Sequence, residues 1–226
     1  MIRFHLITLF PEACEAYLSA SILGRARSDK KMNVSYQNPR SFVDLPKDKK
    51  KNEFSYRKVD ERPYGGGPGM VMMALPVVKA VQKSLVRAKG KTAVIWFQPG
   101  AKVFDNKEAD KLLKYDDVVL ICGRYEGIDE RAKKMVKTMG TLKTYSVGEA
   151  VYTGGELPAM AIVDAVTRRI PGVLGKDESV EERRVASHAS YTRPEVITFG
   201  AKKYKVPSIL LTGHAAKIEE WRKKGN

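Results

Sequence analysis

Apolar residues recur along the chain in short blocks whose spacing switches between that of a strand and that of a helix. Ile2 to Ile7 alternates and then turns apolar, which is typical of a strand that enters a core. Thr92 to Phe97 and Asp117 to Cys122 are almost wholly apolar, as expected of strands buried on both faces. The same patterning predicts further strands at Asn33 to Gln37 and Lys143 to Val147.

Segments with helical spacing lie between these strands. The clearest is Pro158 to Arg169, where proline occupies the first turn, Ile162, Val163 and Val166 form a stripe, and Pro171-Gly172 follows the end. Further helices are expected at Glu12 to Arg27, Leu75 to Ala88, Glu108 to Tyr115, Ile128 to Met139 and Ala215 to Lys224. Alternating strands and helices predict an α/β fold with a mostly parallel sheet.

The pattern changes after Gly175, where apolar periodicity gives way to charge. We predict an α/β domain over residues 1–174, a flexible linker over 175–190 and a short basic C-terminal helical domain over 191–226. No repeat divides the chain further.

The net charge of the chain indicates what kind of partner it binds. The 226 residues carry a formal net charge of +15 and a pI near 9.7, which favours nucleic acid as a partner. The cations cluster between Lys47 and Lys58 and again after Ala201, which predicts two phosphate-contacting surfaces. The alternative is that this charge serves only solubility.

Composition excludes several classes of protein. Two cysteines and three histidines support neither a disulfide framework nor a zinc site, so no metal ligands are predicted. A hydrophobic fraction of 43% argues against a disordered chain. Neither a signal peptide nor a membrane-length apolar run is visible, so we expect a cytoplasmic protein without membrane contact.

Glycines mark the candidate ligand site. Gly65 to Gly69 is a loop but not a dinucleotide fingerprint, and Gly172 to Lys176 lacks the spacing of a phosphate loop. Other glycine-containing loops follow the predicted strands at Gln98, Cys122 and Ser146. Ligands of open α/β sheets bind beyond the carboxyl ends of the strands, so these loops predict a small-ligand crevice. The alternative for each loop alone is a tight turn.

Long strings of residues then resemble one family closely. They are DERPYGGGPGM at Asp60 to Met70, CGRYEGIDER at Cys122 to Arg131, SVGEAVYTGGELPAM at Ser146 to Met160, IPGVLG at Ile170 to Gly175, and YTRP at Tyr191 to Pro194. Together with Gly213-His214 and Trp221-Arg222, they resemble the bacterial tRNA (guanine-N1)-methyltransferase family of the SPOUT superfamily. The resemblance extends from Leu9 nearly to the C-terminus.

The resemblance implies a fold, a reaction and partners. It implies a deep trefoil knot in the α/β domain, a pocket for S-adenosylmethionine, and a homodimer with its active sites at the subunit interface. The reaction implied is methylation of N1 of the guanosine immediately 3′ of the anticodon in tRNA, with a preceding guanosine recognised and Mg²⁺ assisting.

Site residues follow by matching motifs. The cofactor residues implied are Trp96, Phe97, Gln98, Pro99, Gly123, Arg124, Tyr125, Glu126, Ser146, Val147, Gly148, Glu149, Ala150, Val151, Tyr152, Gly154 and Gly155. The basic clusters and matched motifs give the RNA-binding candidates Lys49, Lys50, Lys51, Asp60, Arg62, Arg193 and Arg222. Arg168 matches the arginine that stabilises developing negative charge, although its position near a helix end also suits pairing with the helix dipole.

The general base is where this sequence departs from the family pattern. The family's aspartate position, eight residues after Gly175, is Arg183, and arginine stays protonated. We predict Glu182 as the base, with Glu181 as second choice. Two alternatives remain open: a non-catalytic or impaired RNA-binding protein of the same fold, and a methyltransferase with a different RNA target.

Overall fold

The computed structural model describes residues 1–43, 57–174 and 189–224. The chain divides into two compact units, Met1–Val173 and Leu174–Asn226, and each is described by itself. The predicted base residues Glu181 and Glu182, and Lys49, Lys50 and Lys51, lie outside the described residues.

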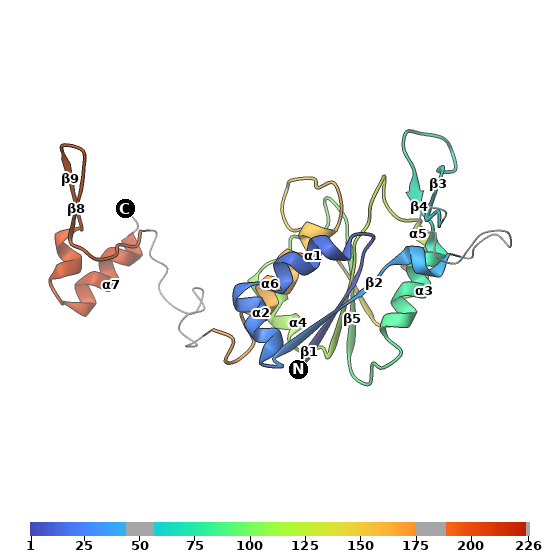
Figure 1. Ribbon diagram of the computed structural model, residues 1–226, viewed down its shortest axis with the longest axis horizontal. Helices are drawn as coiled ribbons and strands as arrows, with labels where there is room; N and C mark the ends of the chain where they lie inside the picture. Colours follow the sequence, from blue (N-terminus) through green and yellow to red (C-terminus); the bar gives the residue numbers. More distant parts are fainter. Residues whose placement is uncertain (44–56, 175–188, 225–226) are drawn as a thin grey trace. The chain divides into compact units, whose positions relative to one another are not determined.

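The first unit is built on a parallel five-stranded sheet (Figure 1). Its strands are β1 (Ile2–Ile7), β2 (Met32–Gln37), β5 (Thr92–Phe97), β6 (Asp117–Ile121) and β7 (Thr141–Tyr145), in the order β2-β1-β6-β5-β7. Every neighbouring pair is parallel. The predicted α/β class with a mostly parallel sheet is confirmed.

Helices cover both faces of this sheet. On one side lie α1 (Pro11–Leu18), α2 (Ser21–Ser28), α4 (Asn106–Leu112) and α6 (Glu156–Thr167), and on the other lie α3 (Ala74–Ser84) and α5 (Glu130–Val136). Strand β6 divides its side chains by alternation: Val118 and Leu120 join the core under α6, whereas Val119 and Ile121 join the core under α3. Burial on both faces explains the nearly continuous apolar run of this strand.

The single helix predicted from Glu12 to Arg27 is wrong. The chain breaks between α1 and α2, and Ser21 has a positive φ of 49°, which a continuous right-handed helix excludes. Gly24 packs onto this break, because a Cβ there would lie 2.2 Å from the carbonyl oxygen of Ser19. Hydrophobic periodicity gives no sign of such close packing between the backbone of Gly24 and that of Ser19.

Short elements complete the two units. In the first, a 3₁₀ helix spans Pro39–Phe42, and β3 (Asp60–Glu61) pairs antiparallel with β4 (Val71–Met72) around the glycine-rich segment. In the second, β8 (Val196–Phe199) and β9 (Lys202–Lys205) form a hairpin that the sequence pattern did not predict. A 3₁₀ helix, Ser208–Leu211, precedes α7 (Ala215–Lys224), which has the predicted bounds. Within the described segments, no helix has the length and apolarity needed to cross a membrane.

Candidate functional site

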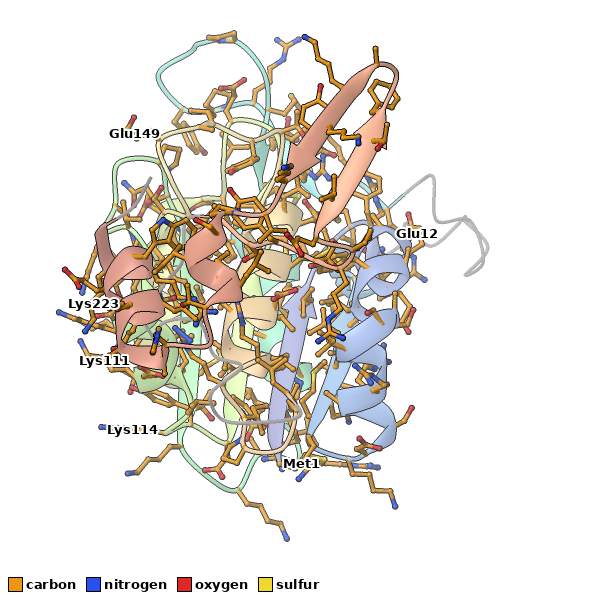
Figure 2. The ribbon with its side chains drawn as sticks, turned by 90° about the vertical axis from the view of Figure 1, so that its left-hand side faces the viewer. Met1, Glu12, Lys111, Lys114, Glu149 and Lys223 are labelled. Carbon is orange, nitrogen blue, oxygen red and sulfur yellow. The ribbon has the colours of Figure 1, made fainter. Side chains whose placement is uncertain are left out.

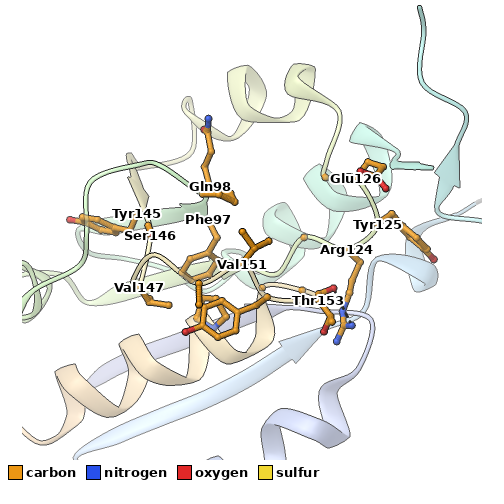
Figure 3. A pocket seen from close by; sticks show the side chains of 18 residues that line it. Phe97, Gln98, Arg124, Tyr125, Glu126, Tyr145, Ser146, Val147, Val151 and Thr153 are labelled. Atoms are coloured by element: carbon orange, nitrogen blue, oxygen red, sulfur yellow. Dashed lines mark hydrogen bonds between the residues drawn. The ribbon is translucent and has the colours of Figure 1, made fainter. Parts of the chain in front are cut away.

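A pocket of about 340 Å³ opens at the carboxyl ends of β5, β6 and β7 (Figure 3). Three loops and the start of α6 form its wall, because parallel strands deliver their following loops to the same edge of a sheet. The pocket is lined by Phe97, Gln98, Pro99, Gly123, Arg124, Tyr125, Glu126, Gly127, Tyr145, Ser146, Val147, Ala150, Val151, Tyr152, Thr153, Gly154, Gly155 and Pro158.

Most of the cofactor residues named from the sequence meet in this pocket, and three do not line it. Trp96 packs in the core under α3, with the Lys133 ammonium 5.7 Å from its ring, and Gly148 and Glu149 belong to the surrounding loop. Four further residues line the pocket although they are not among the cofactor residues named from the sequence: Gly127, Tyr145, Thr153 and Pro158. Tyr145 ends β7 and Pro158 lies in the first turn of α6. These positions, at the carboxyl end of a strand and the start of the next helix, are the sequence signal that could have identified both residues.

Close backbone packing brings two of the loops together. A Cβ on Gly155 would lie 2.6 Å from the Cα of Cys122, and the Gly155 N–H donates to the Gly123 carbonyl at 2.9 Å. A side chain at Gly155 would therefore push apart the loops that follow β6 and β7. Tyr125, two residues beyond Gly123, has a φ of 59°, a left-handed conformation that is uncommon for a residue other than glycine. Strained backbone of this kind clusters at binding and active sites.

Arg124 connects the pocket to the segment that follows β1. Its Nε lies 3.0 Å from Glu156 Oε2, and its guanidinium lies 4.6 Å from the ring centroid of Phe10. The hydroxyl of Thr8 donates to the other oxygen of Glu156 at 2.8 Å. Because Glu156 is buried in the first turn of α6, the helix dipole adds to its stabilisation. These contacts hold the loop after β6 against the start of α6.

Glu108 fixes the side chain of Tyr145 at the pocket wall. The Tyr145 hydroxyl donates to Glu108 Oε2 at 2.6 Å, while Lys102 and Lys111 donate to Oε1 at 2.5 and 2.7 Å. Phe104 packs edge-on against the Tyr145 ring, with centroids 5.3 Å apart. Hydrogen bonds from Lys102, Lys111 and Tyr145 outweigh burial and hold the pKa of Glu108 at about 2.

This pKa predicts a loss of stability in acid. A carboxylate with a lowered pKa in the folded state stabilises the fold above its ordinary pKa, and this contribution disappears as pH falls from about 5 toward 2. We expect Glu108→Gln to lower the free energy of unfolding by about 1–3 kcal/mol at neutral pH and by little near pH 2. Urea unfolding at several pH values measures this difference. The exposed Glu12→Gln is the control, and an equal loss at every pH would contradict the assignment.

A second, larger hollow adjoins the pocket. Its volume is about 1,250 Å³, and it shares Phe97, Gln98, Gly123 and Glu126 with the first pocket. Arg62 lies on its wall, while Asp60 lies in β3 and does not line it. A small ligand in the pocket and a larger ligand in the hollow would therefore contact some of the same residues and lie next to each other.

The other predicted site residues lie further away. Arg168 follows the last turn of α6 as its half-buried C-cap, and it does not line the pocket. Ten residues of helical rise place it roughly 15 Å along the axis from Pro158. In the second unit, Arg193 and Arg222 line one hollow together with Tyr191 and Trp221, whose rings lie 6.4 Å apart.

These features define a class of protein: a parallel α/β protein whose glycine-containing loops form a pocket of small-ligand size beside a larger hollow. Comparison with known proteins identifies the family. Residues 2–226 match the family described as tRNA (guanine-1)-methyltransferase TrmD. The chain belongs to this family and is an enzyme of that class.

Curated relatives agree over nearly the whole chain. A tRNA (guanine-N(1)-)-methyltransferase from Caldanaerobacter subterraneus is 41% identical over 98% of this chain and 85% of its own length. The proteins with this name from Pseudoalteromonas atlantica and Buchnera aphidicola are 40% and 37% identical, over 98% and 99% of this chain and 78% and 80% of their own lengths.

Proposed function

We propose that this enzyme transfers the methyl group of S-adenosylmethionine to N1 of the guanosine immediately 3′ of the anticodon in tRNA. The observation that carries the proposal is that the small pocket and the larger hollow share wall residues, among them Phe97, Gln98 and Gly123. Methyl transfer requires the donor carbon and the acceptor nitrogen to lie in line at one place. A cofactor in the pocket and a guanosine in the hollow would satisfy this requirement.

The pocket has the volume and lining that the cofactor needs. About 340 Å³ falls within the range of small-ligand sites, and its apolar side chains, including Phe97, Val147 and Val151, suit an adenine ring. Without a side chain, the glycines let the loop backbone approach a bound ligand closely. S-adenosylmethionine supplies an electrophilic methyl group on a sulfonium. Among the lining residues, the side chain whose negative charge would attract this positively charged sulfonium is the carboxylate of Glu126.

The acceptor requires a base and a cation. N1 of guanine carries a proton at neutral pH, so a carboxylate must remove it before the nitrogen can attack. Glu182 takes this role in our proposal, with Glu181 as second choice. Negative charge then develops on O6 of guanine, and the guanidinium of Arg168 stabilises it.

The position of Arg168 supports a homodimer. Within one chain it lies roughly 15 Å along α6 from the pocket-lining Pro158, too far for its side chain to act beside the cofactor. A second copy of the chain would supply Arg168 to the pocket of the first. We propose this arrangement together with the trefoil knot that the family resemblance implies. Mg²⁺ is proposed as an assisting ion, although the described residues bring together no cluster of three or more His, Cys, Asp or Glu side chains.

One experiment tests the reaction directly. The protein is incubated with labelled S-adenosylmethionine and undermethylated tRNA, and the modified nucleoside is identified and mapped. Label in 1-methylguanosine at the position 3′ of the anticodon supports the proposal, and tRNA with adenosine at that position is the control. Label at another base or position contradicts the proposed target, while binding of tRNA without label supports a non-catalytic RNA-binding protein.

The basic segment near residue 50 gives a prediction about binding. Replacing Lys49, Lys50 and Lys51 together by glutamine is expected to weaken tRNA binding and to flatten its dependence on salt. For each phosphate that is no longer neutralised, the slope of log affinity against log salt falls by about 0.7–0.9. Titrations at several salt concentrations measure the slope. An affinity and slope equal to those of the unmodified protein would make these lysines a solubility device.

A further inference from the structure

A basic hollow lies at the end of the sheet opposite the cofactor pocket. Its volume is about 800 Å³, and its walls come from the starts of β5 and β7, the end of α5 and the turn between α4 and β6. Figure 2 shows Lys111 and Lys114 at this end of the unit, and Glu149, in a loop beside the cofactor pocket, at the other. Strands of five to six residues separate the two sites by roughly 17–20 Å.

The lysines around this hollow outnumber the acids that neutralise them. Its lining includes Lys91, Lys111, Lys114, Lys137 and Lys143. Lys111 pairs with Glu108, but in the part of the chain that the structure describes no ion pair is formed by the other four. The nearby carboxylate of Asp116 accepts the backbone N–H of Lys91 at 2.9 Å. Like charges around one hollow repel one another, so an anionic ligand would stabilise the arrangement.

The chemistry of the hollow suits the backbone of a nucleic acid. Lysine ammoniums bind phosphates as point charges, and the hydroxyls of Tyr115 and Thr141 add donors for phosphate oxygens. The lining contains no Arg, Asn or Gln, the side chains that most often read base edges. Contact here would therefore depend on phosphate position and not on sequence. The hollow is open, so it suits a polymer that runs across it better than a small anion that needs an enclosed site.

We propose that this basic hollow, lined by Lys91, Lys114, Lys137 and Lys143, binds the sugar–phosphate backbone of the tRNA at a segment outside the anticodon stem-loop. This inference rests on the proposed function in one respect, which is that the bound RNA is taken to be tRNA. The length of the strands favours a segment remote from the target, because nucleotides that adjoin a guanosine beside the cofactor pocket do not reach a site roughly 20 Å away. The hollow would hold a segment of the tRNA away from the target guanosine while the anticodon loop occupies the reaction site.

The test compares two RNAs and two triple variants without cofactor. The first variant, Lys91→Gln with Lys114→Gln and Lys137→Gln, removes three cations of the hollow. The second, Lys83→Gln with Lys107→Gln and Lys134→Gln, removes three exposed lysines of the same unit that do not line it. Fluorescence anisotropy gives the Kd of a full-length tRNA transcript and of its isolated anticodon stem-loop at several salt concentrations.

We expect the first triple variant to bind full-length tRNA roughly 10- to 100-fold more weakly than the second at about 0.1 M salt, with a salt slope lower by about 2–3. Binding of the stem-loop should differ by less than about twofold between the variants, since it has no contact with the hollow. Equal Kd values for full-length tRNA would overturn the proposal and leave the hollow to another anion. Equal weakening of both RNAs would overturn the remote contact. Because no methyl transfer is measured, failure of the proposed reaction does not affect either outcome.

Discussion

Replacing Glu182 by glutamine is expected to slow methyl transfer by roughly 100- to 10,000-fold, the usual cost of losing a general base. Glutamine keeps the shape of the side chain but cannot accept the N1 proton of guanosine. Glutamate reaches the same point as the family's aspartate from a neighbouring backbone position, because it has one more methylene. The measurement is single-turnover transfer at saturating cofactor and tRNA, which separates the chemical step from binding.

Neighbouring carboxylates provide the controls for this prediction. Glu181→Gln is expected to have a smaller effect, and Asp177→Asn is expected to leave the rate within a few-fold of the unmodified enzyme. Arg183 is adjacent and would lower the pKa of a glutamate that it contacts, which weakens a base. Stabilisation of O6 by Arg168 would compensate by acidifying N1. If all three variants retain rates within a few-fold, none of these carboxylates is the base.

Mixing two inactive variants is expected to restore activity. Arg168→Ala removes the cation that we assign to the partner's site, and Gly148→Trp obstructs the cofactor loop at a residue with a φ of 149°. In a mixed dimer, one site combines intact cofactor loops from the Arg168→Ala subunit with Arg168 from the other subunit. Random pairing of equal amounts predicts recovery of about a quarter of the unmodified activity, because half of the dimers each contain one complete site.

The control for this prediction is each variant assayed alone, with cofactor binding and sedimentation measured in parallel. Both variants should sediment as dimers, and Arg168→Ala should still bind S-adenosylmethionine. Absence of recovery from dimers that exchange subunits would place Arg168 and the cofactor loops of one active site in the same chain. An unmodified protein that is fully active as a monomer would refute the shared site.

Several elements were predictable from the sequence because their signals are local. The strand Thr92–Phe97 has the predicted bounds, since a run of apolar and β-branched residues suits a strand buried on both faces. The helix around Ile162 begins two residues earlier than predicted, at Glu156, because helical periodicity defines a face better than an end. Glycine-rich loops after successive parallel strands predicted one crevice, and the structure brings most of the named residues into one pocket.

Contacts between distant segments were not predictable in the same way. Thr8 and Glu156 are separated by 148 positions, and Tyr145 and Glu108 by 37, yet each pair forms a buried hydrogen bond. Hydrophobic periodicity reports which face of an element is buried and not which residue it meets. The β8–β9 hairpin was missed for a related reason: Lys202–Lys205 is charged and exposed, so its pairing leaves no apolar alternation.

By itself, the sequence determined the α/β class, the crevice-forming loops and the family, because these depend on residue types at short and fixed spacing. Only the tertiary structure decided that the pocket at the ends of β5, β6 and β7 shares a wall with the larger hollow. It also decided that Arg168 lies far along α6 from this pocket. It also gathered lysines from segments more than 50 positions apart, Lys91 and Lys143 among them, into one basic hollow. The physical reason is that parallel strands bring remote segments to common ends of a sheet, where charge and shape combine in ways that no local pattern encodes.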